Sequence, residues 1–238
     1  MKDILNQLFE HQHLDRAQAT EILINIAQGG YAPAQVAAFV TVYLMRSVTV
    51  EELAGFRDAL LQLCTPVELD GRTSIDLCGT GGDGKNTFNI STCASFVVAG
   101  AGIPVTKHGN YGVSSICGSS NVMDHLGYRF PTSQEEVLRQ LDKFNFVFLH
   151  APLFHPALKA VSGIRKELGV KTFFNMLGPL VNPAQPPCQL VGVFNLRLAR
   201  LYQHIFEETD RSYRIVHSLD GYDEVSLTAP CKVISQSG

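Results

Sequence analysis

The feature that most constrains the fold is a change in hydrophobic patterning at Pro66. Before it, apolar residues recur at helical spacing and no segment has the pattern of a strand. After it, short β-like runs alternate with helical patterns, which is typical of an α/β layer with a largely parallel sheet. The sequence therefore predicts a small, all-helical N-terminal domain at 1–66 and a larger α/β domain at 67–238. It leaves open that helices around 155–185 pack with the small domain.

The expected elements of the α/β domain follow from this patterning. The predicted strands are 74–78, 104–106, 146–149, 189–194 and 214–219. The predicted helices are 91–101, 133–142, 155–168 and 196–208. In the N-terminal domain, Thr49 and Glu52 have the spacing of a capping box that opens a helix.

Composition and charge exclude several classes of partner. A net charge of −3 over 238 residues gives no global basic field, so we expect no nucleic-acid partner. The six cysteines form no C-x-x-C pair, which favours reduced thiols over a disulfide framework or a zinc site. The N-terminus has no signal-peptide layout, and the longest apolar run, 94–105, is too short and too broken to span a bilayer. A cytoplasmic protein without a membrane partner is expected.

A glycine-rich turn, residues 79–84, follows the first predicted strand. Such turns let backbone N–H groups approach a phosphate, although a plain structural turn would also need glycines. Its spacing fits the dinucleotide fingerprint only in part, because no Asp or Glu lies between Gly84 and Met123. It also begins like a P-loop, but Asn86 stands where a magnesium-binding Ser or Thr is needed.

The 40 residues from Gly84 to Met123 form a local anion basin in a mildly acidic chain. They contain no carboxylate, yet they hold Lys85, Lys107 and His108 together with many hydroxyl groups. Carboxylates would repel a bound pyrophosphate, whereas lysine, hydroxyl and backbone donors stabilise it. A phosphate-bearing ligand is therefore expected here.

Four ordered blocks, which span most of the chain, resemble those of the anthranilate phosphoribosyltransferase family. The blocks are 79–92, then 107–110 with 114–115 and 118–119, then 174–183, and finally 217–226. The resemblance implies transfer of the phosphoribosyl group of phosphoribosyl pyrophosphate to the amine of anthranilate, on the route to tryptophan. It also implies a homodimer, two Mg²⁺ ions and substrates that meet between the two domains. No protein nucleophile is required, because positioning and electrostatics can supply the catalysis.

The resemblance assigns roles to residues that match the family's motifs. For phosphoribosyl pyrophosphate these are Gly79, Gly82, Asp83, Thr87, Asn89, Ile90, Ser91, Thr92, Lys107, His108, Gly109, Asn110, Ser114, Ser115 and Ser119. For anthranilate they are Gly79, His108, Asn110 and Arg165, with Arg165 meeting the carboxylate. For magnesium they are Ser91, Asp223 and Glu224.

The sequence departs from the family pattern in two places. Tyr111 follows Asn110 where the family most often has arginine, and we expect Lys85 to compensate for the lost cation. The chain ends at Gly238, where relatives continue, so an α/β domain that is incomplete at its C-terminus is expected.

Two other functions remain as alternatives at this point. A pyrimidine nucleoside phosphorylase shares the fold, but its signature blocks differ, and the Lys107–Asn110 run favours the transferase. A non-catalytic relative that binds nucleic acid would need a basic stripe on its surface. The acidic pairs Glu207–Glu208 and Asp223–Glu224 argue against such a stripe.

Overall fold

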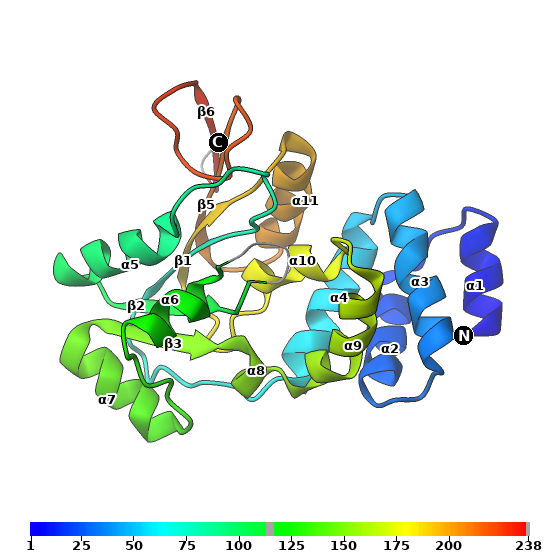
Figure 1. Ribbon diagram of the computed structural model, residues 1–238, viewed down its shortest axis with the longest axis horizontal. Helices are drawn as coiled ribbons and strands as arrows, with labels where there is room; N and C mark the ends of the chain where they lie inside the picture. Colours follow the sequence, from blue (N-terminus) through cyan, green and yellow to red (C-terminus); the bar gives the residue numbers. More distant parts are fainter. Residues whose placement is uncertain (113–116, 237–238) are drawn as a thin grey trace. The chain divides into compact units, whose positions relative to one another are not determined.

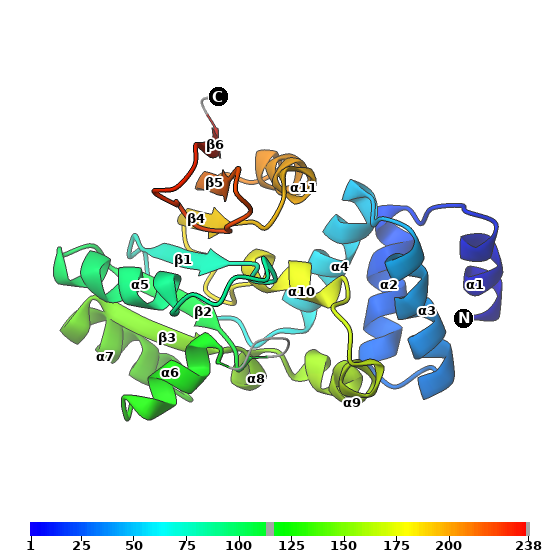
Figure 2. The same cartoon turned by 45° about the horizontal axis from the view of Figure 1, so that its top comes forward.

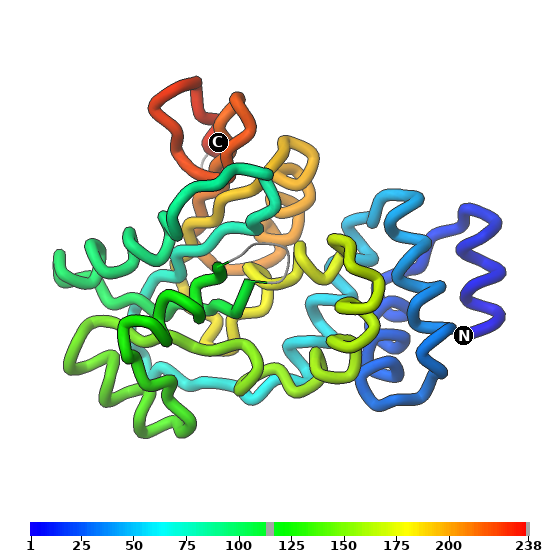
Figure 3. Tube along the Cα trace, in the orientation of Figure 1, coloured from blue at the N-terminus to red at the C-terminus, as the bar shows by residue number. Residues whose placement is uncertain are grey.

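A computed structural model describes residues 1–112 and 117–236 and divides the chain into two compact units. The helical unit combines Met1–Thr65 with Phe154–Val181, and the α/β unit combines Pro66–Leu153 with Asn182–Gly238. The chain therefore leaves the α/β unit once and returns to it, a path that can be followed in Figure 3. The predicted fold class, an N-terminal helical domain and an α/β domain, is confirmed.

The N-terminal part of the helical unit consists of four helices (Figure 1). They are α1 (Lys2–Phe9), α2 (Arg16–Ala27), α3 (Pro33–Met45) and α4 (Val50–Leu63). The predicted capping box opens α4: the N–H of Glu52 donates to the Thr49 hydroxyl (3.2 Å), and the N–H of Thr49 donates to the Glu52 carboxylate (2.9 Å).

Later residues of the chain complete the helical unit. They form η1 (Pro156–Leu158), α9 (Lys159–Leu168), α10 (Phe174–Leu177) and η2 (Gly178–Leu180). The single helix expected at 155–168 is thus divided, with Pro156 opening a separate 3₁₀ turn. Phe173 stacks on Phe56 of α4 with ring centroids 4.5 Å apart, so aromatic packing joins the two sequence segments.

The α/β unit is built on one six-stranded sheet of order β3-β2-β1-β4-β5-β6 (Figure 2). The strands are β1 (Ile75–Gly79), β2 (Val105–Gly109), β3 (Phe146–His150), β4 (Cys188–Gly192), β5 (Ser212–Ser218) and β6 (Cys231–Ser235). The first five strands pair in parallel, and β6 pairs antiparallel with β5. Sequence patterning missed β6, because this short edge strand buries none of its residues fully.

Helices connect the parallel strands of this sheet. They are α5 (Ile90–Gly100), α6 (Ser119–His125), α7 (Gln134–Phe144), the short α8 (Ala151–Phe154), which ends in the helical unit, and α11 (Leu196–Glu207). Parallel strands end at one edge, so the segments after β1, β2, β4 and β5 can share a site there. No helix in the described part of the chain is long and apolar enough to cross a membrane.

Candidate functional site

The glycine-rich turn joins the end of β1 to α5. Gly81, Gly82 and Gly84 have φ values of 60°, 84° and 74°, a backbone conformation that side chains disfavour. The turn is tied to the segment after β5, because the N–H of Gly81 donates to Asp223 Oδ2 (2.7 Å). A Cβ on Gly79 would lie 2.9 Å from the same oxygen, so glycine lets this carboxylate approach the strand end.

Lys107 on β2 is a buried cation, with 2% of its surface exposed. Its Nζ donates to Leu77 O and to the Ser91 hydroxyl (3.2 Å). Burial lowers the pKa of Lys107, while the carboxylates of Asp76 and Glu224 oppose the shift. Through these two hydrogen bonds, the ammonium of Lys107 connects β2 to β1 and to the first turn of α5.

Asp223 and Glu224 lie in the segment between β5 and β6, where burial and neighbouring carboxylates disfavour their negative charges. Burial, reinforced by the nearby Asp83 carboxylate, raises the pKa of Asp223 to about 6. Burial and the adjacent Asp223 raise the pKa of Glu224 to about 7, an effect that Lys107 opposes. Oxygen ligands that repel one another in this way fit a bound Mg²⁺, since a divalent cation would stabilise both ionised forms.

The described residues could supply only part of a metal coordination shell. Within residues 1–112 and 117–236, no group of three or more His, Cys, Asp or Glu side chains could hold a metal ion by itself. Magnesium usually keeps waters and shares its ligands with substrate phosphates. The carboxylate pair therefore fits a metal that arrives with, or is completed by, an oxygen-rich substrate.

Two hydroxyl groups near the turn have unused hydrogen-bonding capacity. Thr80 Oγ1 and Thr92 Oγ1 are buried and lack a hydrogen-bond partner among the residues that the structure describes. A buried hydroxyl without a partner is costly, and a bound ligand or water can satisfy it. Thr80 follows the end of β1 directly, and Thr92 lies in the first turn of α5.

Arg165 belongs to the helical unit, on α9. Its guanidinium lies 5.3 Å from the centre of the Phe174 ring and donates to Asn175 Oδ1 (3.5 Å). Burial lowers the pKa of Arg165, and within the described residues no carboxylate forms a salt bridge with it. A half-buried guanidinium without a counter-charge can accept an anionic ligand.

Comparison with known proteins decides the family. The model "Glycosyl transferase family, a/b domain" matches residues 71–237, and "Glycosyl transferase family, helical bundle domain" matches residues 2–64. The anthranilate phosphoribosyltransferase of Flavobacterium psychrophilum is 60% identical over 235 residues, which are 99% of this chain and 71% of that protein. The Christiangramia forsetii protein of the same name is 58% identical over 237 residues, 100% of this chain and 72% of that protein. This chain belongs to the anthranilate phosphoribosyltransferase family.

Solved structures of anthranilate phosphoribosyltransferases agree in fold. The Thermus thermophilus enzyme superposes with a TM-score of 0.85 at 32% identity, covering 97% of this chain and 70% of that one. The Saccharomyces cerevisiae enzyme, in complex with PRPP and Mg, gives a TM-score of 0.89 at 30% identity, covering 97% and 69%. The resemblance read from the four sequence blocks is therefore confirmed at the level of family and fold.

The structure places the residues predicted from the anthranilate phosphoribosyltransferase motifs in different environments. Thr92, Lys107, His108 and Asp223 are buried. Those that are half-buried are Gly79, Asp83, Asn89, Ile90, Ser91, Gly109, Asn110, Ser119 and Glu224. Gly82 and Thr87 are exposed, Arg165 lies in the helical unit, and Ser114 and Ser115 lie outside the described residues.

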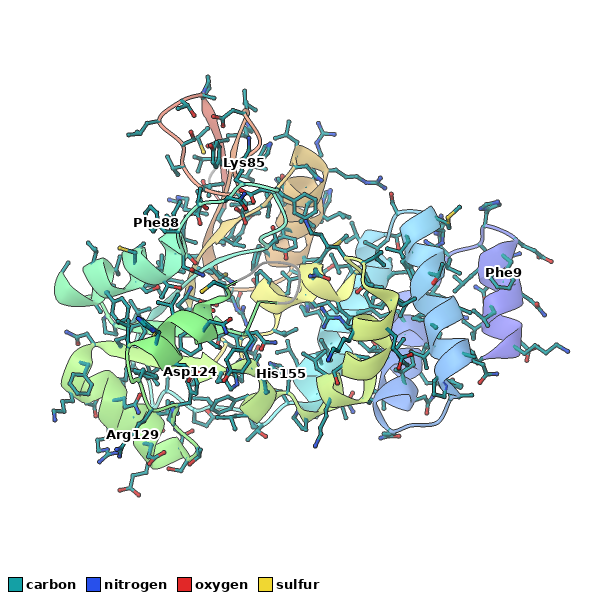
Figure 4. All side chains as sticks on the ribbon, viewed as in Figure 1. Phe9, Lys85, Phe88, Asp124, Arg129 and His155 are labelled. Carbon is teal, nitrogen blue, oxygen red and sulfur yellow. The ribbon has the colours of Figure 1, made fainter. Side chains whose placement is uncertain are left out.

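Lys85 and Tyr111, the two residues linked by the departure from the family pattern, have partners of their own. Lys85 is labelled in Figure 4, and its ammonium lies 4.5 Å from the centre of the Tyr222 ring. The Tyr111 hydroxyl donates to Asp124 Oδ2 (2.7 Å) rather than standing unpaired. Compensation of Tyr111 by Lys85 stays a prediction.

Sequence reasoning missed buried residues that contact the candidate site residues. Asp76 is fully buried on β1, where it accepts from the Asn182 side chain (2.9 Å) and from the His108 N–H (3.4 Å). A Cβ on Gly192 would overlap the carbonyl of Asp223. A carboxylate within an apolar strand was the available signal for Asp76, whereas nothing in the sequence pairs Gly192 with Asp223.

Proposed function

We propose that this chain transfers the phosphoribosyl group of phosphoribosyl pyrophosphate to the amine of anthranilate. The products are N-(5-phosphoribosyl)anthranilate and pyrophosphate, the second step of tryptophan synthesis from chorismate. The observation that carries the proposal is that the glycine-rich turn is bonded to Asp223, which adjoins Glu224, while the buried ammonium of Lys107 acts electrostatically on Glu224. A cation for phosphate and a carboxylate pair for magnesium are what a pyrophosphate substrate requires.

The residues of the α/β unit account for departure of the pyrophosphate. The turn at Gly79–Asp83 and the segments at Asn89–Thr92 and Lys107–Asn110, with Ser119, would bind phosphoribosyl pyrophosphate through N–H, hydroxyl and ammonium donors. Ser91, Asp223 and Glu224 would hold two Mg²⁺ ions. Magnesium bound there supplies positive charge that stabilises the leaving pyrophosphate.

Anthranilate requires a different set of contacts. Arg165 would bind its carboxylate, because a planar guanidinium fork matches a planar carboxylate and Arg165 has no carboxylate partner among the described residues. Gly79, His108 and Asn110 would lie along its path. The amine nitrogen then bonds to C1 of the ribose as the C1–oxygen bond breaks; pyrophosphate leaves with the bonding electron pair, and the amine proton is released to water. Orientation of the two substrates supplies much of the rate.

The loss of anthranilate fluorescence in the presence of phosphoribosyl pyrophosphate and Mg²⁺ tests the reaction. The double substitution Asp223→Ala and Glu224→Ala should abolish turnover while the circular dichroism spectrum stays unchanged. The matched control replaces Glu207 and Glu208 with alanine, because this adjacent acidic pair is exposed at the end of α11. Turnover that survives the first double substitution at saturating Mg²⁺ would remove these carboxylates from the site.

We also propose a homodimer located in the cytoplasm, as the family resemblance implies. The six cysteines are free thiols, which supports a reducing compartment. Light scattering after size-exclusion chromatography should give twice the chain mass of 26.1 kDa. A mass of one chain at micromolar concentration would contradict the dimer.

A further inference from the structure

Two backbone stretches meet beside the end of β2. They are residues 109–112 and residues 117–121, and together we call them the loop stem. Gly118 lies so close to the first stretch that an added Cβ would be 2.5 Å from Asn110 O and closer still to Gly112 N. Only a hydrogen atom fits at such distances. The two stretches are therefore in direct backbone contact.

Asn121 on α6 holds the two stretches together. Its Oδ1 accepts a hydrogen bond from the N–H of Gly112 (3.1 Å) and another from the N–H of Gly118 (2.9 Å). One side-chain oxygen thus satisfies a donor on each side of the stem. This role needs an acceptor, which aspartate also provides and alanine does not.

Tyr111 gives the first stretch a second attachment to α6. Its hydroxyl donates to Asp124 Oδ2 (2.7 Å), on the helix marked by the Asp124 label in Figure 4. Its ring meets His150 of β3 edge-on, with centroids 4.9 Å apart. His150 in turn shares a 2.8 Å hydrogen bond with the Ser120 hydroxyl, so α6, β3 and the stem form one connected group.

The stem carries residues that the proposed function assigns to phosphoribosyl pyrophosphate. The Ser119 hydroxyl donates to Asn110 O (3.4 Å), and the Asn89 side chain donates to Cys117 O (3.4 Å). A Cβ on Gly109 would lie 2.6 Å from the Phe148 ring, so this part of the stem also rests closely on β3. A change in the stem would therefore displace Asn110 and Ser119, which the proposed function assigns to phosphoribosyl pyrophosphate.

We propose that Asn121 and Tyr111 are positioning residues that hold the loop stem in the conformation that binds phosphoribosyl pyrophosphate. The proposal rests on the proposed function and extends it to residues that contact the stem rather than the substrate. Tyr111, bonded to Asp124, acts through the backbone of its neighbours and not by touching phosphate. Weakening either attachment then raises KM for phosphoribosyl pyrophosphate more than it lowers kcat.

The test combines kinetics with hydrogen exchange of the 238-residue chain. Asn121→Ala should raise KM for phosphoribosyl pyrophosphate about tenfold, with kcat within about threefold, because two hydrogen bonds are lost. Amides of residues 109–112 and 117–121 should exchange hydrogens faster in this variant without any substrate present. Asn121→Asp, which keeps the acceptor, should restore slow exchange, and Tyr111→Phe should have a smaller effect of the same kind. Asn6→Ala and Tyr31→Phe, in the helical unit, serve as matched controls and should behave as the unsubstituted chain.

The outcomes separate this inference from the proposed function. Unchanged exchange in Asn121→Ala, or faster exchange with an unchanged KM, would overturn the positioning role alone. If the unsubstituted chain neither consumes anthranilate nor shows a thermal shift with phosphoribosyl pyrophosphate and Mg²⁺, the proposed function fails and the positioning role fails with it. The exchange measurement is independent of turnover, so the two failures are distinguishable.

Discussion

Gly192→Ala tests how closely the segment that contains Asp223, which we propose to bind magnesium, must approach the sheet. Gly192 ends β4, and a Cβ on it would overlap the carbonyl oxygen of Asp223 and lie 2.7 Å from its carbonyl carbon. Nonbonded carbon atoms prefer about 3.5–4.0 Å, so the backbone at Asp223 would have to move by about 1 Å or more. Both contacts are to backbone, which cannot rotate away as a side chain can.

The magnitude follows from this displacement. Misplacing a catalytic group by about 1 Å can cost about 100-fold in rate, so kcat/KM at limiting Mg²⁺ should fall by at least that factor. Overpacking should destabilise the α/β unit by about 1–3 kcal/mol. The melting temperature should therefore fall by several degrees, since each kcal/mol corresponds to about 2–4 °C in a chain of this size.

The anthranilate fluorescence assay, run as a magnesium titration, measures the effect. Gly100→Ala is the matched control, because a Cβ there meets nothing within 4 Å and helix α5 favours alanine. Gly79→Ala should be milder than Gly192→Ala, since its added Cβ meets the Asp223 side chain, at 2.9 Å, rather than backbone. Wild-type kcat/KM in Gly192→Ala at limiting Mg²⁺ would refute the reasoning.

Three further predictions address other parts of the chain. Arg165→Ala should raise KM for anthranilate at least about tenfold more than KM for phosphoribosyl pyrophosphate, because a charged hydrogen-bond partner is lost; equal effects in steady-state kinetics would indicate a structural role. Burial lowers the pKa of His155 to about 4, so the unfolded chain binds the proton more readily and stability is lost as pH falls below about 6.5. Asp223 and Glu224, with raised pKa values, act in the opposite direction in every variant, so the test is a difference between chains. On going from pH 8 to pH 5, urea unfolding should show His155→Gln gaining about 2 kcal/mol relative to the unsubstituted chain, while the control His11→Gln should show no such gain. Tyr111→Arg should change KM for phosphoribosyl pyrophosphate by less than about threefold, because Asp124 would pair with the new guanidinium; a gain of tenfold or more would show that residue 111 reaches the phosphate.

Local patterning predicted most of the architecture, because helices and parallel strands depend on residues close in sequence. Alternation of strand and helix after Pro66 indicated the α/β fold, and the capping box at Thr49 marked the start of α4. Strand β6 escaped prediction because it is short and lies at an edge, where burial imposes little hydrophobic pattern. The break at Pro156 was missed because its flanking residues still follow helical spacing.

By itself, the sequence determined the family and the types of chemical group that the site contains. The glycine-rich turn, the basin without carboxylates and the pair Asp223–Glu224 are visible as residues, although their roles in this chain stay predictions. Only the tertiary structure decided which charges face one another. It buried Lys107 opposite Asp76, and it brought Asp223 against Gly192 from a segment that follows a different strand. Such pairings depend on sheet order and backbone approach across long sequence separations, and pKa values depend on the resulting burial, so neither can be read from local pattern.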